Sequence, residues 1–149
     1  MKNKIEKALN ASIDLLLRAD ADILEIDVNE RTISHRLAEY LEPHFPGWNI
    51  DCEYNRDGHK SKRLDIVPRR VMSDDTKATP VCPDIIIHQR GTQQNLLVIE
   101  IKKTTSREND DYDFRKLRAF KQQLGYRFAV FIKIRTEEDN AGIDGIKWV

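Results

Sequence analysis

Two short runs of aliphatic residues, separated by a polar turn, constrain the fold more than any other feature of the chain. They lie in "CPDIIIHQRGTQQNLLVIEIKK", residues 82–103. Aliphatic runs bounded by turn residues are typical of buried β-strands. We expect strands at 83–89 and 95–102, joined through "RGTQQ", in which Gly91 suits a hairpin turn. The second run is apolar on both faces until Glu100, so we expect both faces to be covered.

Apolar residues at helical spacing predict three helices. The first covers 3–18. The second should start at Asp27 or Asn29, which are both good cap residues, and stop at the Pro-Gly pair of residues 46–47. The third covers roughly 108–124 and follows the hairpin directly.

The remaining segments complete an α/β pattern. Residues 48–54 alternate between apolar and polar and predict a strand with one buried face, whereas 126–134 is apolar at nearly every position and predicts a central strand. The tail, 136–149, can add an edge strand, and 55–80 reads as a long loop or irregular insertion. The strand, helix, strand order implies a right-handed crossover between parallel strands. We therefore expect a mixed central sheet flanked by helices.

Composition indicates one domain, residues 1–149, without an overall electric field. The chain has 25 basic and 25 acidic residues, which argues against a binder held by bulk charge but is compatible with a local basic face. Cys52 and Cys82 lack a metal-ligand spacing, and we expect two reduced, buried thiols. The N-terminal apolar stretch is too short and polar for a signal peptide or a membrane span, so we expect a soluble, cytoplasmic protein.

Charged residues interrupt the two aliphatic runs at matching ends. Asp84 begins the first run, while Glu100 and Lys102 project from one side of the second, because side chains on a strand alternate between faces. If the turn is centred near Thr92, Asp84 lies opposite Glu100 with Cβ atoms roughly 5 Å apart. Their carboxylates could then share one cation, and hard oxygen donors suit Mg²⁺ or Mn²⁺. The alternative is an exposed ion pair between Glu100 and Lys102, but the apolar surroundings favour the cation site, since buried charge needs a partner.

These residues resemble the motif of a known enzyme superfamily. The dipeptide "PD" at 83–84, a hairpin, and "EIK" at 100–102 are similar to the signature of the PD-(D/E)XK nucleases. The predicted elements between 29 and 134 resemble the αβββαβ restriction endonuclease-like core of that superfamily. The extra N-terminal helix and the insertion at 55–80 lie outside this core.

The resemblance implies a role for each residue of the motif. Asp84 and Glu100 would hold a divalent ion together with the backbone carbonyl of Ile101, and Lys102 would orient the attacking water. Many members of the superfamily add an acidic residue from the first core helix, and Glu30 resembles that residue. Glu30 also fits a capping box with Asp27, in which its carboxylate would only close the start of the helix.

Several basic residues are candidates for contact with a nucleic acid. Lys116 and Lys121, on the helix after the motif, could reach a phosphate, although solvated charge is the ordinary fate of such lysines. The insertion is locally basic and could contact a phosphate backbone or lie in solvent. Its candidate residues are Lys62, Arg63, Arg69 and Arg70.

The sequence therefore predicts an Mg²⁺- or Mn²⁺-dependent endonuclease or exonuclease that hydrolyses DNA phosphodiester bonds through a metal-activated water, in restriction, repair or defence. RNA is not excluded as a substrate, and a homodimer or a partner subunit is compatible with this prediction. One alternative is a non-catalytic nucleic-acid-binding or assembly subunit that keeps the nuclease fold. Another is an interaction domain whose charges form structural ion pairs.

Overall fold

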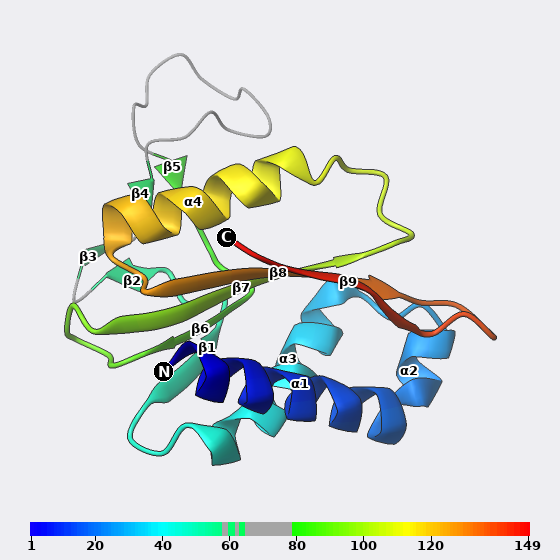
Figure 1. Ribbon diagram of the computed structural model, residues 1–149. Coiled ribbons are helices and arrows are strands. Elements are labelled where there is room, and N and C mark those ends of the chain that lie inside the picture. Colours follow the sequence, from blue (N-terminus) through cyan, green and yellow to red (C-terminus); the bar gives the residue numbers. More distant parts are fainter. Residues whose placement is uncertain (58–59, 62, 65–78) are drawn as a thin grey trace.

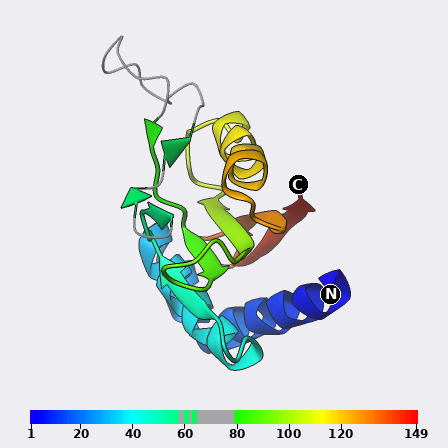
Figure 2. The ribbon, with the colours of Figure 1, turned by 90° about the vertical axis from the view of Figure 1, so that its left-hand side faces the viewer.

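A mixed five-stranded sheet forms the centre of the computed structural model, which describes residues 1–57, 60–61, 63–64 and 79–149. Its strands lie in the order β1 (Asn49–Cys52), β6 (Ile85–His88), β7 (Asn95–Lys103), β8 (Phe128–Arg135) and β9 (Gly142–Trp148). One face is covered by helices α1 (Lys2–Ala19), α2 (Ala21–Glu25) and α3 (Glu30–Leu41), and the other by α4 (Asp111–Leu124), as Figures 1 and 2 show. The predicted α/β class with a mixed sheet is confirmed.

The N-terminal helices follow the predicted spacing with two differences. The connector between the first two predicted helices contains the short helix α2. Helix α3 begins after Asn29, whose side chain accepts a hydrogen bond from the backbone N–H of Thr32 (2.8 Å), so Asn29 is the cap and Asp27 is not. It ends one turn earlier than predicted, in the 3₁₀ turn η1 (Glu42–His44), where Pro43 has no N–H to continue the α-helical bonding.

Strands β6 and β7 form the predicted antiparallel hairpin. Ile85 pairs with Ile99, and the register holds over the next two pairs before a bulge near the turn. Gly91 lies in the turn with a φ of 72°, a conformation that costs glycine little. Extending the register by one residue from the Ile85–Ile99 pair places Asp84 opposite Glu100, as expected from the sequence.

Helix α4 connects two parallel strands. It follows β7 in the chain and packs on one face of the sheet. It ends at Gly125, which caps the helix in the left-handed conformation with a φ of 69°. Strand β8 then pairs with β7 in parallel, and β9 adds an antiparallel edge strand beyond it. The expected parallel pair joined by a helix and the expected C-terminal edge strand are both confirmed.

The alternation of side chains along β7 separates two apolar cores. Ile99 packs into the core under α1 and α3, whereas Val98 packs with Phe120 of α4 on the opposite face. Glu100 and Lys102 share the parity of Val98, and both are buried on the α4 side of the sheet. The charged end of the strand therefore lies beneath α4, where the apolar core gives way to polar side chains.

Strand β1 is shorter than predicted. Glu53 takes a φ of 51°, which interrupts the extended backbone, so Tyr54 joins the core on the α4 side instead of continuing the face of Trp48 and Ile50. The expectation of two buried thiols is wrong, because Cys52 and Cys82 are both free and exposed. Cys52 is the last residue of β1, where the alternation of that strand ends, and Cys82 lies outside the strands.

The insertion contains short extended pieces where the sequence predicted a loop. They pair as β2 (Arg56–Asp57) with β3 (Lys60–Ser61), and as β4 (Arg63–Leu64) with β5 (Thr79–Pro80). Lys62, Arg69, Arg70 and the side chain of Arg63 lie outside the described residues, so their predicted role in binding phosphate stays a prediction. No helix in the described part of the chain has the length and apolar character needed to cross a membrane.

Candidate active site

The charged ends of β6 and β7 open into a pocket of about 230 Å³ between the sheet and α4, which we call the acidic pocket. It is lined by Glu30, Asp84, Glu100, Ile101, Lys102, Glu108, Tyr112, Asp113 and Lys116. Five of these residues carry a carboxyl group and two carry an ammonium group, so the lining has an excess of negative charge. Such a surface favours a bound cation.

Asp84 is held by the backbone of the neighbouring strand. The N–H of Ile101 donates to Asp84 Oδ2 (2.7 Å), and the N–H of Asp84 faces Glu100 Oε1 (3.4 Å). Pro83, the residue before Asp84, has no N–H to donate, and its carbonyl accepts from the N–H of Glu53 (3.0 Å). The chain therefore leaves the sheet pairing directly before Asp84.

The two carboxylates interact unfavourably with each other. Glu100 is only 3% exposed, and Asp84 is partly buried beside it. Burial and the adjacent Glu100 carboxylate raise the pKa of Asp84 well above its usual range, although the Ile101 N–H and Lys116 oppose the shift. A cation placed between the two groups would relieve this repulsion.

Lys116 of α4 provides such a positive charge. Its Nζ lies 2.9 Å from Glu100 Oε1 and donates to the backbone carbonyl of Cys82 (2.7 Å). Lys116 is 8% exposed, so the expectation of a solvated side chain is wrong for this residue. Burial lowers its pKa, but the attraction of Glu100 and Asp84 outweighs burial and leaves the pKa raised. Lys116 therefore remains charged.

Lys102 lies on the predicted face but is bound to α4 and the loop before it. Its Nζ is 2.5 Å from Asp113 Oδ2 and 3.5 Å from Asp110 Oδ1, and it donates to the carbonyl of Asn109 (2.9 Å). Its ammonium is thus neutralised by acids at the start of α4. The side chain fastens that end of the helix to β7.

Glu30 points toward the acidic pocket and does not close its own helix. Its Oε2 accepts from the backbone N–H of Lys103 (3.2 Å), while the N–H of Asp27 donates to the carbonyl of Leu24 (3.1 Å). The capping-box alternative is therefore wrong. Burial is the main cause of the raised pKa of Glu30, and the Asp84 carboxylate adds to it.

The lining supplies donors of the kind that a hard divalent cation prefers. Two carboxylates, Asp84 and Glu100, and the Ile101 carbonyl offer oxygen atoms, and Mg²⁺ commonly takes one or two carboxylates and keeps several waters. Among the described residues, no group of three or more His, Cys, Asp or Glu is arranged to hold a metal ion. The residues present therefore suit a cation site with two acidic ligands, Asp84 and Glu100. Glu30 lines the same pocket from α3 and adds a third carboxyl group.

One further sequence candidate, Lys121, lies away from the acidic pocket. It donates to the carbonyl of Val149 (2.7 Å), which ties α4 to the C-terminal residue. His88 on β6 is buried, and its Nε2 lies 2.7 Å from Asp51 Oδ2. Sequence reasoning missed Asp113, although a signal existed, because it lies one helical turn before Lys116 and Leu117.

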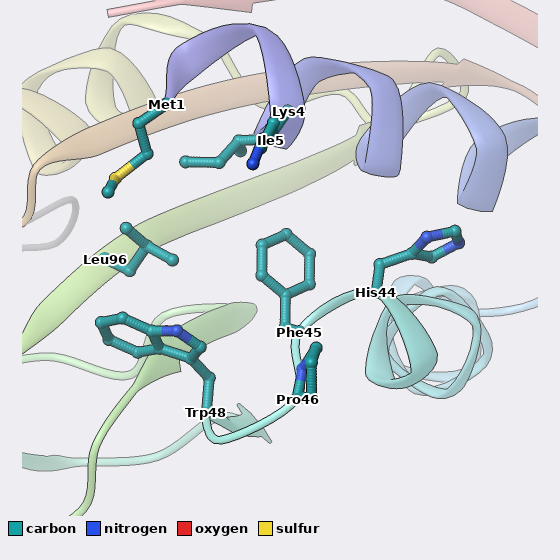
Figure 3. Close-up of a pocket in the computed structure, with 8 residues that line it drawn as sticks. All are labelled: Met1, Lys4, Ile5, His44, Phe45, Pro46, Trp48 and Leu96. Carbon is teal, nitrogen blue, oxygen red and sulfur yellow. The ribbon is translucent and has the colours of Figure 1, made fainter.

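A second pocket, of about 190 Å³, shares no lining residue with the acidic pocket (Figure 3 shows its side chains). It is formed where the start of α1 meets η1 and the beginning of β7, and is lined by Met1, Lys4, Ile5, His44, Phe45, Pro46, Trp48 and Leu96. This lining is mainly apolar and contains no carboxylate side chain, so the acidic pocket is the stronger candidate for chemistry.

Comparisons of the chain with protein-family models, with curated proteins and with solved structures found no match.

Proposed function

We propose that this protein is a metal-dependent nuclease that hydrolyses phosphodiester bonds of DNA, with a PD-(D/E)XK-like αβββαβ core formed by α3, β1, β6, β7, α4 and β8. One observation carries the proposal. Asp84 and Glu100 are placed opposite each other by the hairpin register, in a pocket with excess negative charge and with a buried ammonium beside them. Two carboxylates buried side by side lower the stability of the fold, and such a cost is expected at a functional site.

A divalent ion bound here would supply a water of lowered pKa and would stabilise the charge that develops on a scissile phosphate. The chain's own residues have separate tasks. The Ile101 N–H fixes the orientation of the Asp84 carboxylate, so this ligand is already in place before binding. Glu100 is fixed by its neighbours on the sheet and by Lys116, and Glu30 adds negative charge from α3. The resemblance assigns Lys102 to the water, a role that requires its ammonium to leave Asp113.

The alternative, a non-catalytic subunit that keeps the same fold, is favoured by the ion pair between Lys116 and Glu100, because it partly satisfies the acidic pocket without a metal. The two proposals differ in their response to a divalent cation and to DNA.

Cleavage of plasmid and single-stranded DNA by the purified protein tests the proposal. We expect nicking or degradation in Mg²⁺ or Mn²⁺ and none in EDTA. Asp84→Asn should lower the rate by roughly 100-fold or more, since it removes a charged oxygen donor at the site of chemistry. Asp144→Asn, an exposed carboxylate on β9, is the matched control and should leave the rate unchanged. DNA binding without cleavage under all these conditions would favour the non-catalytic subunit.

A further inference from the structure

Of the two ammonium groups that line the acidic pocket, only that of Lys116 neutralises the hairpin carboxylates Glu100 and Asp84. Lys102, the other lysine of the lining, is paired with Asp113. Lys116 is left to balance Glu100 at 2.9 Å and to act on Asp84 through space. It lines the pocket from α4, whereas Glu100 lines it from β7.

Lys116 Nζ occupies space beside Glu100 that a cation ligated by this carboxylate would need. It lies within bonding distance of a Glu100 oxygen and of a backbone carbonyl, that of Cys82, so its surroundings are oxygen atoms. Two cations cannot share this space without strong repulsion, because the local dielectric constant is low. Binding of a divalent ion and the contact between Lys116 and Glu100 therefore exclude each other.

We infer that Lys116 is the resident counter-ion of the acidic pocket: its ammonium occupies the cation position in the metal-free protein, and a divalent ion binds by displacing it from Glu100. This inference rests on the proposed metal site. The long, flexible lysine side chain can turn away from Glu100, and because it is anchored on α4 its charge stays at the edge of the pocket. There it is available to an anionic phosphate, which gives α4 a direct part in substrate binding.

The inference predicts opposite effects of one substitution on stability and on metal affinity. Lys116→Met keeps an unbranched side chain one atom shorter than lysine and removes its charge. In EDTA the variant should unfold at a lower temperature than the wild type, because Glu100 loses its partner. Its affinity for Mn²⁺, measured by electron paramagnetic resonance of the free ion, should be at least about tenfold higher, because the ion no longer competes with an ammonium. Saturating Mn²⁺ should then recover most of the lost thermal stability.

Three further variants complete the test. Lys121→Met, on the same helix but bonded to Val149, should leave Mn²⁺ affinity unchanged. Lys116→Arg keeps the positive charge and should bind Mn²⁺ as weakly as the wild type. If Lys116→Met does not fold in EDTA, the double variant Lys116→Met/Glu100→Gln should fold, since it removes both members of the pair.

The possible outcomes separate the inference from the proposed function. Wild-type protein that binds Mn²⁺ and cleaves DNA, with a Lys116→Met variant that binds no more tightly, overturns the inference alone. Failure of both proteins to bind Mn²⁺ overturns the metal site and the inference together. A double variant as unstable in EDTA as Lys116→Met would show that Lys116 does not balance Glu100, whatever the metal result.

Discussion

At the scale of single residues, Asp84 shows how the acidic pocket costs stability. A carboxylate that is buried next to another carboxylate is less stable ionised than in water, and its raised pKa expresses this penalty. Under the proposed function a bound cation would remove this penalty, so the group that weakens the metal-free protein would strengthen the metal-bound one. Trade-offs of this kind are typical of functional sites.

This gives a pH-dependent prediction for Asp84→Asn in EDTA. Because the folded pKa of Asp84 is raised, the folded protein binds the proton more tightly than the unfolded chain, and ionised Asp84 lowers stability above that pKa. The variant should therefore unfold at a higher temperature than the wild type at neutral pH. Its advantage should shrink as the pH falls through the raised pKa towards the unfolded value of about 3.9. Thermal unfolding followed by circular dichroism from pH 4 to 8 measures the difference in unfolding temperature between Asp84→Asn and the wild type. A difference that does not change with pH would show that ionised Asp84 does not destabilise the fold.

Residue-level sequence reasoning placed the two carboxylates and Lys102 on the correct face of the sheet, but did not foresee which acids the lysine ammonium groups contact. The hairpin turn and the period of two determine which face Asp84 and Glu100 share, so a short local pattern is sufficient. A lysine has four rotatable bonds, and its charged end can lie far from its Cα. The positions of Lys102 and Lys116 Nζ depend on which acids α4 brings near them, which no local pattern contains.

At the scale of elements, the start of α4 is fastened to β7 by a buried ion pair. Lys102 and Asp113 have side chains that are 4% and 10% exposed, and their charged atoms lie 2.5 Å apart. The pair determines how closely the first turn of α4 approaches the strand. It therefore helps to position Lys116, which lies on the next turn of the same helix.

Loss of one partner should be costly at this position. Lys102→Met leaves Asp113 buried without its cation, and we expect a loss of about 3–5 kcal/mol in the free energy of unfolding. The double variant Lys102→Met/Asp113→Leu should recover most of this loss, since an apolar pair of similar volume is tolerated. Lys133→Met breaks a more exposed pair with Asp110 and should cost less than about 1 kcal/mol. Urea unfolding measures all three, and a loss for Lys102→Met no larger than for Lys133→Met would show that the pair does not hold the helix.

The elements that sequence predicted well are those with a strong internal period. The spans of α1 and β8 lie within two residues of their predicted bounds, because their apolar faces are continuous. The early end of α3 and the short β1 depend on one proline and on one residue with a positive φ, Glu53. Single positions of this kind override a periodic pattern and are hard to weigh beforehand.

At the scale of the whole molecule, one sheet serves two cores that differ in composition. The core under α1 and α3 is larger and includes Leu37, whereas the core under α4 is built around Phe120 and Tyr126. The acidic pocket receives Glu30 from the first layer and Lys116 from the second. Its geometry therefore depends on both layers.

Because the sheet connects the two cores, we expect them to unfold together. Leu37→Ala should lower the free energy of unfolding by about 2–5 kcal/mol and Phe120→Ala by about 3–5 kcal/mol, since both side chains are fully buried. In each variant, urea transitions followed by tryptophan fluorescence and by circular dichroism should coincide. Separate transitions for the two probes would show that one layer can open while the other remains folded.

The order of the strands has a consequence for synthesis on the ribosome. All neighbours in the sheet are consecutive among its own strands, so it can assemble without one strand inserting between two others. The helix α1, however, is made first, and part of its apolar cluster lies on β7 and β8, roughly a hundred residues later. At a translation rate of about 5–20 residues per second, the apolar face of α1 stays without these strands for on the order of 5–20 seconds. During that interval α1 and α3 have mainly each other to cover their apolar residues, and a nascent chain stalled before β7 would be a natural client for chaperones.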